Sequence, residues 1–355
     1  MEKVLMKGNE ALAEAAIMAG CRHYYGYPIT PQTEVAAYMA KRMPKIGGVF
    51  LQAESEIAAI NMVIGTSAAG KRTMTSSSSP GISLKSEGIS YLAGCDLPAL
   101  VVNVQRGGPG LGGIQPSQSD YFQATKALGH GDFRRIVLAP ASVQEMASLT
   151  FLGFDLADEY RMTVMILTDG TIGQMMEPVS LDFGEPCEAV KDWATVGHNW
   201  ERKPNIITSL SLQAEELEQQ NIERYERYKV VEENEVRYEE YRMEDAEICV
   251  VAFGVCARVA RNAIEAARAK GLKVGMIRPI TLWPFPNAPI QAAAKHAKAF
   301  LTVEMSMGQM VEDIELAIRC TRPVLCCSRV GGIIPSPDEV VAKLNEAAKM
   351  GGKAE

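Results

Sequence analysis

The run Ala99–Arg106, ALVVNVQR, sets the tightest limit on how this chain folds. Its apolar residues follow one another without alternating with polar ones, which is typical of a strand buried on both faces. Such strands lie inside parallel sheets that carry helices on either side, so the run predicts an α/β fold. It also delivers Arg106 to the carboxyl end of the strand, where parallel sheets gather their ligands.

One carboxylate has an unusual place in the helix predicted over residues 55–69. Glu56 stands one turn before Ala59 and Ile60, so it opens the apolar stripe of the helix rather than its solvated face. A carboxylate in that position must find a partner or change its pKa. The residues alone leave two interpretations open, an interaction with the helix dipole or a chemical role.

Two short motifs resemble a known family. The run EIAA from Glu56, with Gly65 nine positions after the glutamate, and the upstream segment 27–31, YPITP, resemble the pyrimidine-domain (alpha-type) chain of the 2-oxoacid:ferredoxin oxidoreductases. The resemblance implies a thiamine diphosphate enzyme in which Glu56 activates the cofactor. A carboxylate that hydrogen-bonds the ring nitrogen N1′ in a dry pocket favours the 4′-imino form, which removes the C2 proton.

The resemblance also implies roles for neighbouring residues. Thr30 and Arg106 would orient the substrate, and Arg106 is suited to a bidentate pair with the carboxylate of a 2-oxo acid. We expect residues 76–79 to form a polar turn, closed by Pro80-Gly81, that leads into a helix over 82–93. The implied cofactor-binding residues are Glu56, Pro28, Ile29, Ser78 and Ser79.

Two of these residues also have structural interpretations. Thr30 fits the N-cap of a helix predicted over Gln32–Met43. Arg106 fits an ordinary loop arginine that pairs with Asp96 or Asp120. At the level of sequence both interpretations stay open.

Two further motifs match cofactor sites only in part. Residues 108–113 satisfy G-x-G-x-x-G, but prolines obstruct the helix that should follow, and the next strand ends without an acid, so NAD binding is rejected. This glycine-rich loop is better interpreted as a flexible wall over the substrate. Asp169-Gly170, with Asn199 thirty positions beyond, approximates the Mg²⁺ and diphosphate motif of thiamine enzymes, but its first glycine is missing. The chain therefore has the pyrimidine half of a thiamine site, and a second chain should supply the diphosphate half.

Changes in composition divide the chain into three parts. We expect a pyrimidine-binding domain over residues 1–180, a charged and partly helical connector over 181–245, and a second α/β domain over 246–355. Residues 278–286 and 304–309 resemble the transketolase C-terminal-like domain of the same family. The fold class expected is thus α/β, a parallel-sheet pyrimidine domain plus a transketolase C-terminal-like domain with a docking role.

Composition also limits the partners. The formal net charge of −7 gives no reason to expect nucleic acid or an anionic membrane, and no apolar run approaches membrane-spanning length. We therefore expect a soluble, cytoplasmic protein. Its eight cysteines, which we expect to be mostly buried thiols, contain no C-x-x-C pair, so any iron–sulfur cluster should belong to another chain.

The resemblance implies an assembly, expected to be a dimer of hetero-oligomers. This chain would share thiamine diphosphate with a beta-type subunit that holds Mg²⁺, and a gamma-type subunit and a ferredoxin-like delta subunit would complete the complex. Partner chains would carry the [4Fe–4S] clusters. The implied reaction converts a 2-oxo acid and coenzyme A to acyl-CoA and CO₂ while reducing external ferredoxin.

The substrate is less constrained than the reaction. Residues 105–112 and 118–123 look most like the branched-chain members, which act on 2-oxoisovalerate, and the 2-oxoglutarate members are close relatives. Two rivals from other classes remain at this level. One is a non-oxidative thiamine decarboxylase or transketolase-like enzyme, and the other is a noncatalytic assembly subunit in which Glu56 is only structural.

Overall fold

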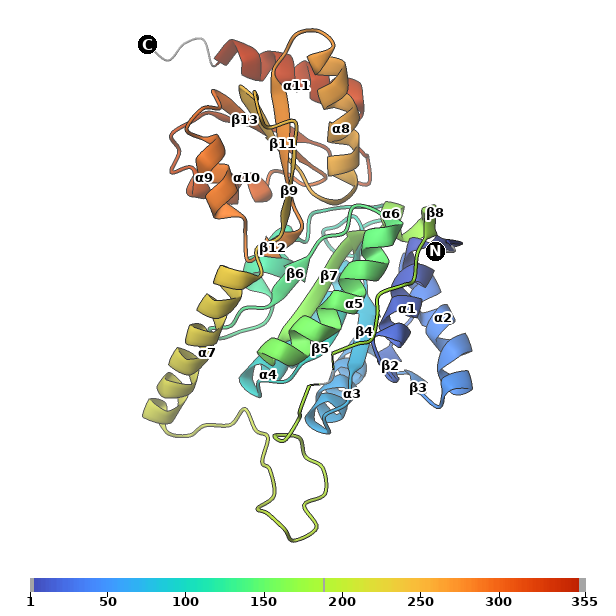
Figure 1. Cartoon of the computed structure of the whole chain (residues 1–355). Helices are drawn as coiled ribbons and strands as arrows, with labels where there is room; N and C mark the ends of the chain where they lie inside the picture. The colour runs from blue at the N-terminus through green and yellow to red at the C-terminus, as the bar shows by residue number, and fades with distance from the viewer. Residues whose placement is uncertain (1–2, 188, 351–355) are drawn as a thin grey trace.

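The computed structural model describes residues 3–187 and 189–350, which form two α/β modules (Figure 1). The first module is built on a seven-stranded sheet. In spatial order its strands are β12 (Thr281–Trp283), β6 (Ile136–Leu138), β7 (Thr163–Asp169), β5 (Ala99–Gln105), β4 (Thr73–Ser77), β2 (His23–Gly26) and β3 (Val49–Gln52). All neighbouring pairs are parallel except β12 with β6.

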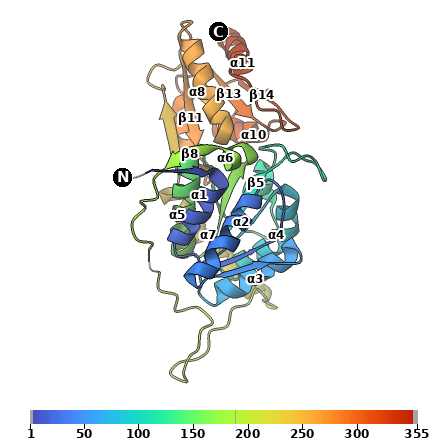
Figure 2. The same ribbon diagram turned by 90° about the vertical axis from the view of Figure 1, so that its right-hand side faces the viewer.

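Helices cover both faces of this sheet, as Figure 2 shows. They are α1 (Gly8–Met18), α2 (Thr33–Arg42), α3 (Glu56–Ala68), α4 (Ser79–Gly94), α5 (Val143–Tyr160) and the short α6 (Gly170–Gln174). The strand β5 lies inside the sheet between β4 and β7, and all seven of its residues are buried. The α/β class predicted from its unbroken apolar run is confirmed.

Two strands at the start and end of the first module form a separate small sheet. The strand β1 (Val4–Lys7) pairs antiparallel with β8 (Met176–Val179). Met6 and Val179 are buried there with side chains of α1 and α5. This pairing ties the N-terminal segment to the chain some 170 residues later, and the sequence analysis did not predict it.

The second module is built on a five-stranded sheet (Figure 1). In spatial order its strands are β14 (Val324–Ser328), β13 (Ala299–Glu304), β10 (Ile248–Val251), β11 (Val274–Pro279) and β9 (Tyr238–Tyr241), and its helices are α8 (Gly254–Arg268), α9 (Asn287–Ala293), α10 (Met310–Ala317) and α11 (Pro337–Met350). The strands β14, β13, β10 and β11 pair in parallel, as an α/β domain requires, whereas the edge strand β9 pairs antiparallel with β11.

The strand β12 links the two modules. It follows β11 directly in the chain, but it pairs with β6 at the edge of the first sheet. Thr281 lies opposite Leu138, and Trp283 lies opposite Val137. The sequence of this segment, rich in proline and aromatic residues, did not reveal that it crosses from one sheet to the other.

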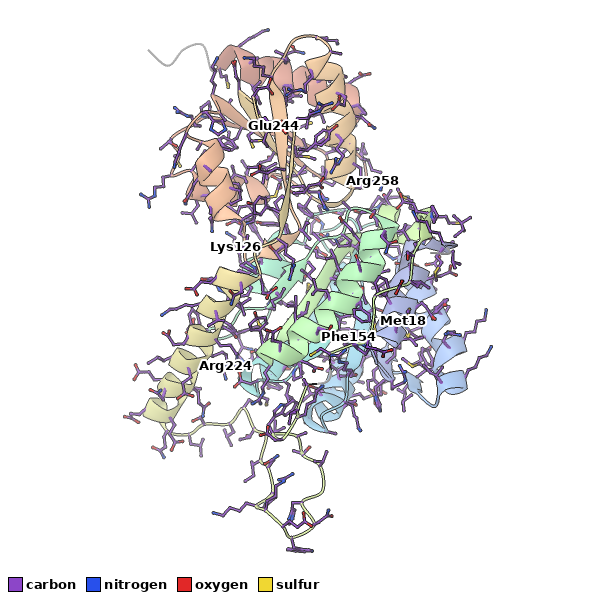
Figure 3. The ribbon with its side chains drawn as sticks, viewed as in Figure 1. Met18, Lys126, Phe154, Arg224, Glu244 and Arg258 are labelled. Carbon is purple, nitrogen blue, oxygen red and sulfur yellow. The ribbon has the colours of Figure 1, made fainter. Side chains whose placement is uncertain are left out.

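The connector contains one long helix, α7 (Ala214–Asn234). Residues 189–213 before it form neither helix nor strand, and in Figure 1 this segment loops away from the body at the end opposite the second module. The helix agrees with the predicted partly helical connector and is mostly exposed, but it buries Arg224, whose Nε donates to Asp96 Oδ1 at 3.0 Å. Figure 3 labels Arg224 on this helix.

Polar contacts fasten the modules to each other. Asp313 of α10 accepts hydrogen bonds from Tyr121 Oη at 2.5 Å and from Lys126 Nζ at 2.6 Å, and Figure 3 labels Lys126 near this junction. On the other side, Arg278 donates from both terminal nitrogens to the Glu145 carboxylate at 2.7 and 2.8 Å.

The expectation that the cysteines are mostly buried holds only in part, since four of the eight are buried, two are half-buried and two are exposed.

Candidate active site

Four neighbouring strands bring the predicted residues to one edge of the first sheet. Thr30 follows β2, Glu56 follows β3, Ser78 follows β4, and Arg106 follows β5. These strands lie in the order β5-β4-β2-β3 and run in parallel, so their carboxyl ends meet at the same edge. Such an edge is the usual ligand site of a parallel sheet.

Glu56 is the first residue of α3 and is only 5 % exposed. The helix is capped by Ser55, whose Oγ accepts from the Ala58 amide at 3.1 Å. Among the described residues, none donates a hydrogen bond to the Glu56 carboxylate; its electrostatic neighbour is Lys85 of α4. Its place in the first turn agrees with the dipole interpretation, but a favourable dipole does not require burial.

A glycine makes room for the Glu56 carboxylate. A Cβ atom added at Gly81 would lie 2.6 Å from Glu56 Oε1 and 2.1 Å from Ser77 Oγ, both closer than real contacts allow. Gly81 lies in the first turn of α4, which begins at Ser79 with Pro80 as its second residue. The turn predicted over residues 76–79 is therefore wrong, because proline in the first helical turn begins a helix as readily as it closes a turn.

The serines at the end of β4 fall into two groups. Ser76 and Ser79 are fully engaged: Ser76 bonds Tyr24 Oη at 2.7 Å, and Ser79 Oγ donates to Asp120 Oδ2 at 2.5 Å. The hydroxyls of Ser77 and Ser78 are buried and have no hydrogen-bond partner among the described residues. Ser78 thus retains hydrogen-bonding capacity for a ligand, as does Ser77, which the sequence analysis did not single out.

Thr30 lies in an exposed turn that precedes α2. The helix begins at Thr33, its N-cap is Gln32, and the Thr30–Pro31 peptide is cis. The interpretation of Thr30 as the N-cap is therefore wrong, because the turn ends before the helix starts. Pro28 is exposed and Ile29 half-buried in the same segment, which leaves all three residues on the rim of the site.

Arg106 is 8 % exposed and has no carboxylate partner among the described residues. Its Nη1 donates to the Thr30 carbonyl oxygen and its Nη2 to the Leu111 carbonyl oxygen, both at 3.1 Å, whereas its buried Nε has no partner. The pairing with Asp96 or Asp120 considered for it is wrong: Asp96 pairs with Arg224, and Asp120 accepts from Asn103 Nδ2 at 2.9 Å.

The glycine-rich loop after Arg106 lies beside the second module, and Figure 2 shows it in teal at the junction. A Cβ atom at Gly112 would lie 1.8 Å from the Gly107 carbonyl oxygen, so this tight turn requires glycine. The loop leaves Leu111 84 % exposed. No α-helix begins within it, in agreement with the rejected dinucleotide motif.

Asp169 is fully buried at the carboxyl end of β7, opposite Gln105 of β5 at the same edge of the sheet, and serves as the cap of α6. Its Oδ1 accepts from the amides of Thr171 and Ile172 at 2.8 and 3.2 Å, and its carboxylate also bonds the Val255 amide of the second module. Burial raises the pKa of Asp169 to about 6. Asn199, its supposed partner, lies in the segment that has no regular structure. These contacts agree with the rejection of the Mg²⁺ motif.

The residues present fit the pyrimidine ring of thiamine diphosphate. The edge offers a buried carboxylate to which no described residue donates, two buried hydroxyls with spare capacity, and a space that a side chain at Gly81 would fill. A flat ring that carries both donors and acceptors can use each of these groups. Among the described residues, no group of three or more His, Cys, Asp or Glu side chains could hold a metal ion.

Comparison with known proteins decides the family. Residues 14–243 match the family model described as pyruvate flavodoxin/ferredoxin oxidoreductase, thiamine diphosphate-binding. The chain belongs to this family. Residues 246–340 match a second model, the pyruvate:ferredoxin oxidoreductase core domain II. The predicted membership in the 2-oxoacid:ferredoxin oxidoreductases, as an alpha-type subunit, is confirmed.

Relatives and solved structures agree with this membership. The oxidoreductase chain is 51 % identical to the ketoisovalerate oxidoreductase subunit VorB of Methanothermobacter thermautotrophicus over 98 % of this chain and 99 % of that protein. A 2-oxoglutarate:ferredoxin oxidoreductase from Magnetococcus marinus, solved with 2-oxoglutarate, coenzyme A and succinyl-CoA, superposes with a TM-score of 0.87 at 31 % identity. The match covers 98 % of this chain and 65 % of that one, so the chain spans slightly under two thirds of its length.

A more distant likeness shows the fold alone. A split-gene transketolase superposes with a TM-score of 0.60 at 14 % identity, over 97 % of this chain and 99 % of that one. The predicted transketolase-like architecture is thereby confirmed. In the part of the oxidoreductase chain that the structure describes, every helix is too short or too polar to cross a membrane.

Proposed function

We propose that the oxidoreductase chain forms the pyrimidine half of a thiamine diphosphate site and that the enzyme oxidises 2-oxoisovalerate. The observation that carries the cofactor proposal is the buried Glu56 carboxylate, which faces the space at Gly81 and receives no hydrogen bond from the described residues. When bound, thiamine diphosphate supplies the nucleophilic carbon that attacks the keto group and takes up the electrons released by decarboxylation.

Glu56 would hold the pyrimidine ring through its N1′ nitrogen and would share one proton with it. Burial excludes water from this contact, which strengthens the hydrogen bond and keeps the proton from exchanging with solvent. Ser77 and Ser78 offer hydroxyls to the polar edge of the ring, while Pro28 and Ile29 line the rim beside it. Ser79 contributes indirectly, because its hydroxyl already bonds Asp120 and the Arg106 backbone.

Arg106 and Thr30 orient the substrate. The Arg106 guanidinium contacts only carbonyl oxygens among the described residues, so its charge is available to the substrate carboxylate. The Thr30 hydroxyl lies on the exposed turn that Arg106 holds in place. The loop from Gly107 walls the substrate in, and its glycines let the backbone come close.

The remaining parts of the reaction belong to partner chains. A beta-type subunit would hold Mg²⁺ and the diphosphate, gamma-type and delta-type subunits would complete the complex, and [4Fe–4S] clusters on partner chains would supply one-electron transfer to ferredoxin. Coenzyme A accepts the acyl group. Within this chain we assign pyrimidine binding to residues 1–180 and subunit docking to residues 246–355, and we place the assembly, a dimer of hetero-oligomers, in the cytoplasm.

The substrate assignment rests on the 51 % identity to a ketoisovalerate oxidoreductase subunit. The second candidate is 2-oxoglutarate, which the enzyme from Magnetococcus marinus carries in its structure. That substrate has a second carboxylate, which needs a second cation in the pocket. Competition between the two acids on the purified complex decides, and a clear preference for 2-oxoglutarate would refute the branched-chain assignment.

Calorimetry tests the split site. Thiamine diphosphate and Mg²⁺ are titrated into this chain alone and into the complex with its co-purified partners. We expect tight binding only in the complex. Tight binding by the isolated chain would mean that this chain contains the diphosphate site. A purified complex without the colour of iron–sulfur clusters would favour a non-oxidative thiamine enzyme.

A further inference from the structure

A short segment of the first module, residues 117–122, lies in the junction between the modules and is held by the second one. Gln118 is 1 % exposed, and its backbone amide donates to the Met305 carbonyl oxygen at 3.0 Å. Its side chain accepts from the Met305 amide at 3.2 Å and donates to the Phe253 carbonyl oxygen at 2.9 Å. Both polar atoms of this side chain are thus bonded to the backbone of the second module.

A glutamine of the second module makes the reciprocal contact. The Gln309 side chain accepts from the Phe122 amide at 2.8 Å and donates to the Ser119 carbonyl oxygen at 2.7 Å. A glutamine side chain both donates and accepts, so one residue can hold a backbone N–H and a backbone C=O group together. Two glutamines, one from each module, therefore hold this segment near both of its ends.

The residue between these contacts, Asp120, is bonded to the first module. Its Oδ2 accepts from Ser79 Oγ at 2.5 Å and from Asn103 Nδ2 at 2.9 Å. Its backbone amide donates to Gln105 Oε1 at 3.1 Å. Asp120 thereby joins the first residue of α4 to two residues of β5, the strand that delivers Arg106.

The Ser79 hydroxyl links Asp120 to Arg106. A hydroxyl has a single hydrogen, so when Ser79 donates it to Asp120, its lone pairs remain for the Arg106 amide, which donates at 3.0 Å. The Arg106 carbonyl oxygen, 3.2 Å from the same hydroxyl, is the longer of the two competing acceptors. A carboxylate at residue 120 therefore selects the hydroxyl orientation that holds the Arg106 backbone.

We propose that Asp120 is a positioning residue for substrate binding and that the second module, through Gln118 and Gln309, holds Asp120 in place. Asp120 acts through Ser79 on Arg106 and makes and breaks no bond in the reaction. The inference rests on the proposed role of Arg106. It goes beyond that role because it gives the second module a part in substrate affinity besides subunit docking.

Steady-state kinetics on the complete complex test the inference with two variants of Asp120. Asp120→Ala removes the acceptor of the Ser79 hydroxyl, so KM for 2-oxoisovalerate should rise about tenfold or more, while kcat and thiamine diphosphate affinity should stay within about twofold. Asparagine keeps an oxygen that can accept both hydrogen bonds, so Asp120→Asn should bring KM to within about threefold of the wild type. An unchanged KM in Asp120→Ala, or equal losses in both variants, would overturn the inference.

Gln118→Met and Gln309→Met test the part of the second module. Each removes the side-chain hydrogen bonds, keeps the side-chain length and should raise KM in the same direction as Asp120→Ala. Gln309 is half-buried, so its variant measures the effect even if Gln118→Met prevents assembly.

Arg258→Met is the matched control. Arg258 of the second module donates to Glu177 of β8 at 2.8 Å, and Figure 3 labels it on the other side of the junction from Lys126. Its variant removes a contact between the modules and should leave KM unchanged. If it raises KM as much as the glutamine variants do, or if neither glutamine variant raises KM, the inference is wrong.

The Arg106→Lys background separates this inference from the proposed function. If Asp120 acts through Arg106, Asp120→Ala changes KM less than about twofold in that background. Losses that multiply in the double variant would overturn the inference and leave the role of Arg106 intact. An unchanged KM in Arg106→Lys alone would refute the proposed role of Arg106 and the inference with it.

Discussion

Arg106 donates a hydrogen bond from Nη1 to the Thr30 carbonyl oxygen at 3.1 Å and so joins the ends of two strands that lie on either side of β4. The contact holds the Thr30 turn on the rim of the site. Because the acceptor is a neutral carbonyl, it leaves the guanidinium charge uncompensated. A bound carboxylate is the partner that this arrangement lacks.

Arg106→Lys should therefore weaken substrate binding more than cofactor binding. Lysine keeps the charge but loses the planar fork that contacts the turn and a carboxylate together. We expect KM for the 2-oxo acid to rise about 10- to 100-fold, corresponding to about 1.4–2.7 kcal/mol, with thiamine diphosphate affinity within about twofold. Steady-state kinetics on the complex measure both. Arg319→Lys, at an exposed position in the second module, serves as the control, and an unchanged KM in Arg106→Lys would refute the assigned role.

Gly81→Ala should damage the cofactor site through a single methyl group. Its Cβ would lie within 2.6 Å of Glu56 Oε1 and 2.1 Å of Ser77 Oγ. We expect a stability loss of about 1–3 kcal/mol and weaker thiamine diphosphate binding. Gly65→Ala is the matched control on α3: nothing lies within 4 Å of its added Cβ, so it should stabilise the helix by roughly 0.5–1 kcal/mol. Chemical unfolding and calorimetry compare the two.

Glu56→Gln should leave the complex folded and reduce turnover at least about 100-fold, because the amide cannot share a proton with the ring nitrogen. The side chains have nearly the same shape, so packing is preserved. Turnover and thermal unfolding are measured on the same preparation. Wild-type turnover in a folded variant would show that Glu56 has only a structural role, as in the assembly-subunit alternative.

Lys85 should make stability depend on pH in the alkaline range. Its pKa is about 7 in the folded chain and about 10.5 when unfolded, so between these values only the unfolded chain binds the proton. The free energy of unfolding should therefore rise with pH in this range. Relative to Lys85→Met, which cannot titrate, the wild type should gain roughly 2–4 kcal/mol between pH 7 and pH 10. Urea unfolding across this range checks the slope, and parallel curves would contradict it.

Much of the site could be predicted because its signals are local in sequence. The apolar stripe that Glu56 opens predicted its burial, and the unbroken apolar run before Arg106 predicted the strand that carries it. Both signals depend only on residues within a turn or a strand of the one concerned. The same holds for most helices and strands, whose bounds in the structure differ from the predicted ones by a few residues.

The errors and omissions concern contacts between distant residues. Thr30 has an N-cap side chain and precedes a proline, but the tie to Arg106, 76 residues later, places it in a turn instead. The sequence analysis did not single out Lys85, which is completely buried in α4. Its spacing from Gly81 and Gly88 was the available signal, since glycines on one helical face mark a close helix contact. The pairing of β12 with the first sheet, although it follows a strand of the second, gave no comparable signal in the local sequence.

The exchange of β12 has a consequence for how such a gene can be divided. A truncated chain that ended in the connector would lack Thr281–Trp283. The backbone N–H and C=O groups of β6 would then form an unpaired edge of the first sheet. Unpaired sheet edges of this kind pair with strands of other molecules, which leads to aggregation. The genetic boundary between the two modules is therefore not a place where the protein can be cut, even though the sequence on either side is recognisable as a domain of its own.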